Sequence, residues 1–310
     1  MNGTVIVDKP SGKTSFDIVH DIRKVLNIKK IGHTGTLDPM TTGVLPVCIN
    51  EATKLIQFFV EDDKEYRATM LLGVETDTLD MEGKVVARKL PDVTVDEIGD
   101  VIQSFTGTIE QRAPRYSAIK FKGKPLYKWT REGVDITPPL RTIEIYRIIV
   151  EEIALPYVSF VVACSKGTYI RSLCADIGKQ LGCGACLYKL RRIKSGHFRE
   201  ESAIILEGLN RKEKERAIRE NLLPMADTLP HFCSIVIDAE VEDKIKKGYQ
   251  PRIDMLKRYS PGKLAEGDVV KFVSEDNRIV AVARMLVSSV DMSQSWGDGD
   301  VAKILRVFNG

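Results

Sequence analysis

The segment from Ile31 to Asn50 constrains the fold more than any other part of the chain. Asp38 is its only formally charged side chain. Pro39 disfavours the α region for Asp38, and glycines permit tight turns or the close approach of a ligand. The segment holds three of them: Gly32, Gly35 and Gly43. We therefore interpret it as a shaped loop that presents one carboxylate.

Two interpretations of Asp38 are open. An aspartate, with an ordinary pKa of about 3.9, is ionised at neutral pH and can act as a nucleophile without a neighbouring base. Burial beside Leu37, Pro39 and Met40 would raise that pKa by up to about 3–5 units without a partner, so a reactive Asp38 needs a fixed cation nearby. Alternatively, Asp38 caps a helix that begins at Pro39, which is a favourable pairing.

Several blocks of the sequence occur in an order typical of one known family. Gly32-His33-Thr34-Gly35-Thr36-Leu37-Asp38-Pro39, continued by Thr42-Gly43-Val44-Leu45-Pro46, resembles the signature loop of the TruB family of tRNA pseudouridine synthases. Further blocks agree in order: Asp8-Lys9-Pro10 with Gly12, Thr14 and Ser15; Lys64-Glu65-Tyr66-Arg67; Thr76-Asp77-Thr78 with Asp80 and Gly83; Ser165-Lys166-Gly167-Thr168-Tyr169-Ile170-Arg171; and Leu190-Arg191-Arg192. The tail resembles the family's small PUA RNA-binding domain.

The resemblance implies an activity and a set of roles. A uridine at position 55, in the T-stem-loop of tRNA, would be converted to pseudouridine without metal or organic cofactor. Asp38 would be the catalytic aspartate, either as a nucleophile on the sugar or base or as a base toward the C2′ proton. Arg171 would hold Asp38 ionised, and Tyr66 would stack on the flipped uracil, with proton transfer as a second role.

Other roles follow from the same blocks. His33 would help to fill the space left by the extruded base, Leu190 would line the pocket, and Lys9 would support the active site and is also a candidate RNA contact. Ordinary structural roles compete with these: Arg171 as a surface arginine, Tyr66 as a buried strand tyrosine and Leu190 as a core leucine.

A basic segment predicts contact with RNA. From Gln111 to Arg131 the chain contains cations and no acid. Because the net charge of the whole chain is only +3, the rest of the chain is acidic. The cations are Arg112, Arg115, Lys120, Lys122, Lys124, Lys128 and Arg131. Aromatic residues such as Tyr127 are interleaved with them, which suits RNA because phosphates take the charges while bases stack on the rings. By the resemblance, residues 111–146 would form a thumb that orders on RNA; a solvated loop is the alternative.

Two further stretches are rich in cations, and each is either an extension of an RNA track or a solvated face. The first contains Lys189, Arg191, Arg192, Lys194 and Arg199, and the second contains Lys244, Lys246, Lys247, Arg252, Lys257 and Arg258. If several phosphates are neutralised, affinity falls steeply with salt.

The pattern of elements predicts an α+β fold, a mainly antiparallel sheet flanked by helices, because strands and helices do not alternate strictly. Helices are expected over 15–26 with a Ser15 cap, 94–104 with a Thr94 and Glu97 capping box, 169–180 and 210–220. Strands are expected over 66–72, 141–151, 157–163, 233–237, 269–273 and 279–285, with turns at Gly262, Gly267 and Gly297. The chain has 310 residues, and we expect a catalytic domain over 1–228 and a β-rich PUA domain over 229–310.

Other function classes are disfavoured. No signal peptide or membrane span is visible, so we expect a cytoplasmic protein. Cys183-Gly184-Ala185-Cys186 lacks the second pair that a structural zinc site needs, so no metal is expected. Gly12-Lys13-Thr14 is no phosphate-binding loop, because Val7 stands where that motif requires glycine.

We expect tRNA as the partner, with no obligatory protein partner. Two rival hypotheses remain. A guide-RNA-dependent synthase of the dyskerin type shares these blocks but depends on partner proteins, and the long insertion favours the stand-alone form. A non-catalytic RNA-binding or tRNA-folding protein would not need Asp38.

Overall fold

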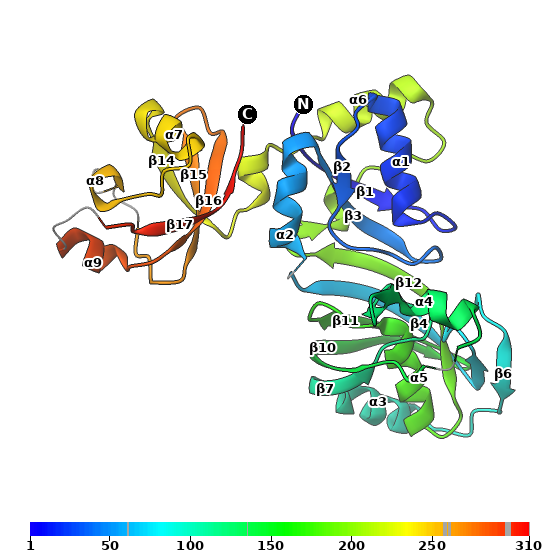
Figure 1. The fold of residues 1–310 in the computed structure, drawn as a ribbon. Helices are drawn as coiled ribbons and strands as arrows, with labels where there is room; N and C mark the ends of the chain where they lie inside the picture. Colours follow the sequence, from blue (N-terminus) through cyan, green and yellow to red (C-terminus); the bar gives the residue numbers. More distant parts are fainter. Residues whose placement is uncertain (61, 135, 257–258, 260–261, 295–298, 310) are drawn as a thin grey trace.

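The larger part of the molecule is built on one mixed sheet (Figure 1). The computed structural model describes residues 1–60, 62–134, 136–256, 259, 262–294 and 299–309. The strand order is β1-β3-β12-β4-β11-β10-β7, with β2 beside β3 and β13 beside β12. Neighbouring strands are antiparallel except β12 and β3, which pair in parallel. The strands are β1 (Gly3–Lys9), β2 (Ile31–His33), β3 (Thr42–Ile49), β4 (Lys64–Leu72), β7 (Gly107–Arg112), β10 (Leu140–Ala154), β11 (Tyr157–Cys164), β12 (Ala185–Ser195) and β13 (Phe198–Arg199).

Helices bury their apolar sides against this sheet in two clusters. One cluster joins α1 (Ser15–Leu26) and α6 (Arg211–Glu220) to β1 and β3. The other joins α3 (Val95–Ser104) and α5 (Ile170–Gln180) to β4, β10, β11 and β12. In α1 the buried residues recur at helical spacing, which makes one continuous apolar face. The two clusters confirm the prediction of a mainly antiparallel sheet flanked by helices.

The structure corrects the start of α1. The helix is capped by Thr14, whose hydroxyl accepts from the Asp17 amide while the Asp17 carboxylate accepts from the Thr14 amide. Ser15, the predicted cap, is instead the first helical residue and is buried. For α3, the predicted capping box of Thr94 and Glu97 is confirmed.

The segment from Ile31 to Asn50 is less of a loop than predicted. Its two ends are the strands β2 and β3, and only residues 34–41 lie between them. β3 tolerates Pro46 because β12 pairs with β3 only at Thr42 and Gly43, and β2 pairs only from Val47 to Ile49. Pro46 therefore has a paired strand on one side alone, β1.

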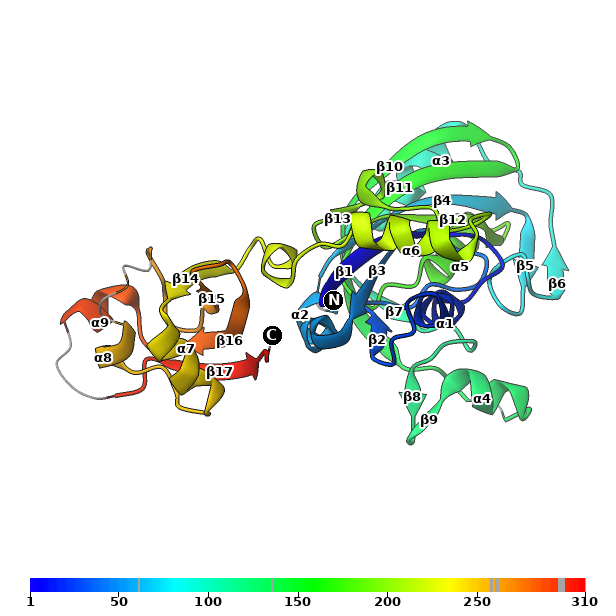
Figure 2. The same cartoon turned by 90° about the horizontal axis from the view of Figure 1, so that it is seen from above.

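The predicted thumb is an insertion between β7 and β10. These two strands pair from Gly107 with Ile145 to Arg112 with Leu140, so both ends of the predicted range 111–146 belong to the sheet. The part that leaves the sheet is residues 113–139, and it contains β8 (Lys120–Phe121), β9 (Lys124–Pro125) and α4 (Leu126–Arg131). Figure 2 shows β8, β9 and α4 projecting from the body of the molecule.

The C-terminal part has a separate sheet of order β14-β15-β16-β17, which begins at Cys233, close to the predicted boundary. Its apolar core is its own, and a further cluster, including Phe59, Phe198 and Phe308, joins it to the larger part. The elements are β14 (Cys233–Ile237), β15 (Val269–Ser274), β16 (Ile279–Met285), β17 (Ala302–Val307), α7 (Ala239–Lys246), α8 (Ile253–Leu256) and α9 (Ser289–Gln294). The predicted turn at Gly297 lies outside the described residues.

Smaller elements complete the larger part of the molecule. β5 (Val74–Thr76) and β6 (Val85–Arg88) form a two-stranded sheet whose connection contains Asp80, and α2 (Ile56–Phe59) precedes β4. No helix in the described part of the chain is long and apolar enough to cross a membrane.

Candidate active site

Asp38 lies on the loop of residues 34–41, which is anchored on both sides of it. The Leu37 amide donates to Ser15 Oγ at 2.8 Å. On the other side, the Pro39 carbonyl accepts from the Gly12 amide at 2.9 Å and from Lys9 Nζ at 3.0 Å. A turn, not a helix, follows Asp38, since the Thr41 amide donates to the Asp38 carbonyl. The helix-cap interpretation of Asp38 is therefore wrong.

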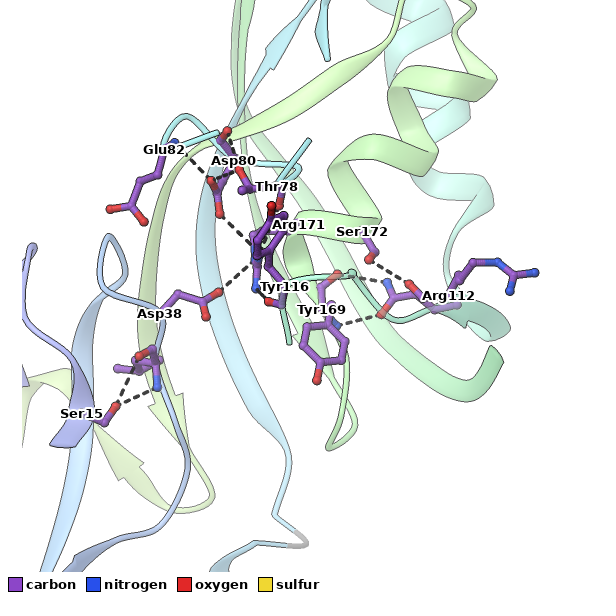
Figure 3. Close-up of polar contacts among 12 residues, drawn as sticks. Ser15, Asp38, Thr78, Asp80, Glu82, Arg112, Tyr116, Tyr169, Arg171 and Ser172 are labelled. Carbon is purple, nitrogen blue, oxygen red and sulfur yellow. Dashed lines mark hydrogen bonds and ion pairs between the residues drawn. The ribbon is translucent and has the colours of Figure 1, made fainter. Parts of the chain in front are cut away.

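Arg171 faces Asp38 from the first turn of α5 (Figure 3). Its Nε lies 3.0 Å from Asp38 Oδ2, and the Arg171 side chain is only 6% exposed. Nη1 lies 3.5 Å from Asp80 Oδ2 and donates to the Thr78 carbonyl, while Nη2 donates to the Tyr116 carbonyl, both at 3.0 Å. Arg171 is thus a buried cation shared by two acids, not a surface arginine.

Asp80 is itself fixed. The Thr78 hydroxyl donates to Asp80 Oδ1 at 2.6 Å and the Glu82 amide donates to the same oxygen at 3.1 Å. Asp80 is 4% exposed. A carboxylate that is buried, hydrogen bonded and paired in this way fixes the angle at which Arg171 meets Asp38.

The electrostatic environment of Asp38 is balanced between opposing influences. Burial raises the pKa of the Asp38 carboxyl, the Arg171 guanidinium opposes this shift, and the charge of Asp80 adds to it. The Asp38 side chain is still 39% exposed, so a ligand can reach it. Asp38 is therefore an accessible carboxylate held by a fixed cation, which is the arrangement that a reactive aspartate requires.

A cavity of about 1010 Å³ opens above this pair. Tyr66 and Leu190, the other two predicted pocket residues, both line it. Tyr66 is half-buried on β4, and Leu190 lies nearby on β12, where it also belongs to the apolar core. The lining also includes Tyr127 and Arg131 of the insertion, Arg141 of β10, and Lys166 of the segment before α5.

The insertion is attached to the helix that contains Arg171. The Gln111 side chain, 2% exposed, donates to the Tyr169 carbonyl at 3.0 Å and accepts from the Tyr169 amide at 2.8 Å. Ser172 Oγ donates to the Arg112 carbonyl at 2.9 Å. Together with the bond from Arg171 to the Tyr116 carbonyl, these contacts form a latch between the base of the insertion and the start of α5 (Figure 3).

Most of the predicted cations of the insertion reach solvent. The exposed side chains are Arg112, Arg115, Lys120, Lys122, Lys128 and Arg131. Lys124 differs, because it forms an ion pair with Glu132 and lies 4.4 Å from the centroid of the Trp129 ring. Tyr127 stacks under Arg131, at 5.5 Å, on the wall of the cavity. The insertion therefore presents positive charge beside the cavity.

Lys9 is not available to RNA, which corrects its assignment as a candidate RNA contact. Its side chain is fully buried, and Nζ donates to the carbonyls of Pro10, Lys13 and Pro39. Burial lowers the pKa of its ammonium group to about 8. Lys9 instead supports the loop that contains Asp38.

His33 lies outside the cavity wall in the described structure. It ends β2, is half-buried, and its Nδ1 has no hydrogen-bond partner in the described part of the chain. Burial, with a smaller contribution from Arg192, lowers the pKa of its imidazole.

Parts of the two other basic stretches are neutralised within the protein. Arg191 pairs with Asp8 at 2.8 Å and with Glu200 at 2.6 Å. In α7 and the residue after it, each of three lysines pairs with an acid four residues earlier: Lys244 with Glu240, Lys246 with Glu242 and Lys247 with Asp243. Lys257 and Arg258 lie outside the described residues. We conclude that α7 presents a face of mixed charge, not a basic one.

Sequence reasoning did not single out several residues of the site. Asp80, Lys166 and Arg192 stood out only as members of family blocks or of a basic stretch, and Glu82 and Arg141 did not stand out; all five line the cavity. A signal existed for Asp80, since it stands in a block beside Thr78, its hydrogen-bond donor. No group of three or more metal-ligating side chains is found among the described residues.

Comparisons with known proteins agree with this geometry. The family model "TruB family pseudouridylate synthase (N terminal domain)" matches residues 23–170, and "tRNA pseudouridylate synthase B C-terminal domain" matches residues 171–229. The tRNA pseudouridine synthase B of Syntrophus aciditrophicus is 50% identical over 309 residues, covering 100% of this chain and 99% of that protein. The protein of the same name from Clostridium tetani is 44% identical over 280 residues, covering 90% and 94%.

A solved structure shows the same fold. A chain in the crystal structure of a Cbf5-Nop10-Gar1 complex superposes with a TM-score of 0.76 at 32% identity, covering 99% of this chain and 85% of that one. The fold and the matched segments define the class of protein as pseudouridylate synthase, an isomerase. Within that class, the chain belongs to the TruB family.

Proposed function

We propose that this chain converts uridine 55, in the T-stem-loop of tRNA, into pseudouridine. The observation that carries the proposal is the ion pair of Asp38 and Arg171 at the cavity, inside the segments that match the TruB family. The name tRNA pseudouridine synthase B, borne by relatives of 50% and 44% identity, supports tRNA as the substrate.

The chemistry needs one ionised carboxylate beside the sugar. The C1′–N1 bond of the uridine breaks, the uracil rotates, and its C5 bonds to C1′. In our scheme the Asp38 carboxylate starts this sequence, as a nucleophile or by removing the C2′ proton, and Arg171 keeps it ionised and oriented. No step requires a metal or an organic cofactor. If deuterium at C2′ slows the reaction, Asp38 acts by removing the C2′ proton and not as a nucleophile.

The target base must leave the RNA stack to reach Asp38. Extrusion costs a few kcal/mol, and stacking on one aromatic ring returns about 1–3 kcal/mol. Tyr66 is the aromatic side chain of the cavity wall that we assign to this stacking, with Leu190 completing the pocket. Residues 113–139 then act as a thumb that grips the RNA backbone through their exposed cations.

The remaining parts of the proposal concern the whole chain. Residues 1–228 form the catalytic domain, and residues 229–310 form a PUA-type domain that contacts the acceptor end of tRNA. The enzyme acts in the cytoplasm without an obligatory protein partner. If protection of the thumb from protease did not change on addition of tRNA, the thumb assignment would fail.

The decisive experiment uses the purified chain and an unmodified tRNA transcript, with no cofactor or partner added. We expect complete conversion of uridine 55 by the wild type and none by Asp38→Asn. Asp77→Asn is the matched control, because Asp77 is exposed and its side chain accepts a hydrogen bond from the Lys84 amide. Equal conversion by wild type and Asp38→Asn would refute the catalytic role of Asp38.

A guide-dependent enzyme is the second candidate, favoured by the likeness to the Cbf5-Nop10-Gar1 complex. Under that alternative, folded wild type would bind tRNA but leave uridine 55 unmodified until a guide RNA and partner proteins were added. Failure to modify any RNA under either condition would instead favour a non-catalytic RNA-binding protein.

A further inference from the structure

Arg192 is a buried cation of the cavity wall that the scheme above does not use. It is 1% exposed, and it is the largest of the fully buried side chains among the described residues. On β12 its Cα is paired with Tyr66 of β4 on one side and with Gly43 of β3 on the other. Gly43 has a φ of +101°, and a Cβ there would lie 2.2 Å from the Arg192 carbonyl oxygen. Glycine at position 43 lets β3 approach the backbone of Arg192 closely.

The Arg192 guanidinium joins two parts of the site. Nε donates to the Val44 carbonyl at 2.7 Å, and Nη2 donates to the Gly35 carbonyl at 3.2 Å. Tyr66 is the cross-strand neighbour of Arg192, both residues line the cavity, and the Arg192 charge opposes the rise that burial causes in the pKa of the Tyr66 phenol. Arg192 therefore holds the loop that contains Asp38 and lies beside the tyrosine on the neighbouring strand β4.

Arg192 lacks the counter-charge that the other arginines of the site possess. Arg171 has two acids within ion-pair distance, and so does Arg191. For Arg192 no ion pair with a carboxylate is found in the described part of the chain. Burying a cation without an anion is costly, and proteins tolerate the cost where the charge has a use. The Tyr66 oxygen, as phenolate, is the anion that this cation can reach.

We propose that Arg192 is a positioning residue that orients the Tyr66 hydroxyl and stabilises its phenolate while Tyr66 moves the proton from C5 to N1. This inference rests on the proposed conversion of uridine. Once C5 is bonded to C1′, the ring contains a C6=N1 double bond, and C5 still holds its hydrogen. N1 takes the hydroxyl proton of Tyr66, and the phenolate takes the proton of C5. The electron pair of the broken C5–H bond forms the C5=C6 double bond, so Tyr66 ends as it began.

The charges around Tyr66 support this assignment. Burial raises the pKa of the Tyr66 phenol, and Arg192 makes the largest opposing contribution. The neighbouring Cys164 and Asp38 act in the same direction as burial. Loss of the Arg192 charge would therefore leave the phenolate with no nearby cation of comparable effect.

The test must separate proton transfer from support of the loop, since Arg192 also contacts Gly35 and Val44. Single-turnover rates are measured on tRNA whose target uridine contains hydrogen or deuterium at C5. We expect Arg192→Met to lower the rate about 10²-fold, the usual contribution of a proton-transfer group, and to enlarge the deuterium isotope effect. Tyr66→Phe should behave alike, and the double variant should lose no more than either single one.

Matched controls keep the result interpretable. Arg191→Met removes the neighbouring arginine of the same strand and should leave the isotope effect unchanged. Arg192→Lys retains the charge, and we expect it to keep a small isotope effect with a partial loss of rate. If both Arg192 variants fail to fold, the isotope effect of Tyr66→Phe still tests the inference. An unchanged isotope effect in Tyr66→Phe would show that Tyr66 does not transfer the C5 proton, and Arg192 could then have no part in that transfer.

Additive losses in the double variant, or a rate loss with an unchanged isotope effect, would show that Arg192 only supports the loop. Those outcomes overturn this inference and leave the proposed function intact. A wild type that converts no uridine would overturn the proposed function itself, because it gives no rate on which an isotope effect can be measured.

Discussion

Asp80 acts on Asp38 through the arginine that the two carboxylates share. Its buried carboxylate shares Arg171 with Asp38 and accepts two hydrogen bonds of its own. We expect Asp80→Asn to lower the single-turnover rate about 10²-fold, because a small displacement of Arg171 misdirects Asp38. The Kd for tRNA should stay unchanged. Asp77→Asn, in the same connection, should retain the wild-type rate; equal losses would assign the effect to folding of that connection.

The pH dependence of the rate reports on Asp38. Burial and Asp80 place the pKa of its carboxyl above the ordinary value of about 3.9 despite Arg171. In the proposed scheme the ionised form of Asp38 starts the reaction, so the rate should fall as the pH decreases through this raised pKa. Asp80→Asn removes a negative charge near Asp38 and should lower the pKa of the Asp38 carboxyl. The acid limb of the rate profile should then move to lower pH, although the maximal rate is lower. A single-turnover rate profile from about pH 4 to 8 checks both, and a limb that does not move would contradict the electrostatic account.

At the scale of elements, the latch between the insertion and α5 connects RNA contact to catalysis. Gln111 bonds both backbone groups of Tyr169, two residues before Arg171. Gln111→Glu replaces the donor to the Tyr169 carbonyl with a second oxygen, which removes one hydrogen bond and adds repulsion. A loss of about 1 kcal/mol at this bond corresponds to a rate about fivefold lower.

The control for this variant is Gln103→Glu, since Gln103 also donates to a carbonyl, that of Ile148, but on α3 away from the cavity. Rates and melting temperatures of both variants are compared with wild type. If Gln103→Glu slowed the reaction as much as Gln111→Glu, the latch would have no special connection to Arg171.

The insertion and α7 offer a matched pair for testing the RNA track. Replacing the exposed Lys120, Lys122 and Lys128 with alanine should weaken tRNA binding and reduce the slope of log K against log salt by about 0.7–0.9 for each phosphate that the variant no longer neutralises. Removing the same charge at α7, as Lys244, Lys246 and Lys247 to alanine, should leave the slope unchanged, because those lysines pair with acids. Titrations at several salt concentrations measure both slopes. Equal changes of slope in the two variants would show that the net charge of the protein, and not the position of the lysines, determines the salt dependence of tRNA binding.

Predictability from sequence differed among the elements for physical reasons. α1 and α3 were predictable because their apolar spacing and capping residues are local. β3 was not, since Gly43 and Pro46 normally oppose a strand, and only the neighbouring strands show that both are tolerated. The choice of Thr14 over Ser15 as the cap likewise depended on where Asp17 points, which spacing alone leaves undecided.

At the scale of the whole molecule, the site combines residues that the sequence separates widely. The loop of Asp38 could be singled out because its composition is unusual, and the resemblance to the TruB family pointed to Arg171 and Tyr66. The contact of Arg192 with Gly35, and that of Arg171 with the Tyr116 carbonyl, depend on strand order and on the path of the insertion. Local patterns contain no information about either, so these contacts required the structure.

Lys271 couples the C-terminal sheet to the segment that precedes it. The residue is buried on β15, and its ammonium group donates to the Ala226 carbonyl at 2.6 Å and to the Leu229 carbonyl at 2.9 Å. Lys271→Met leaves the Ala226 carbonyl without its donor and the Leu229 carbonyl with the Phe232 amide alone, so it should lower the free energy of unfolding by about 1–3 kcal/mol. Lys303→Met, on the exposed side of β17, should cost far less. Calorimetry of the two variants compares them directly.

The same variant tests the proposed role of residues 229–310 in binding the acceptor end. A loosened C-terminal sheet should weaken binding of full-length tRNA while binding of an isolated T-stem-loop, which has no acceptor end, stays at the wild-type value. The cavity that contains Asp38 lies in the larger part of the molecule, so the single-turnover rate on the bound stem-loop should also be retained. If Lys271→Met weakened both RNAs equally, the C-terminal sheet would act by supporting the catalytic part through their shared apolar cluster, and the acceptor-end contact would be rejected.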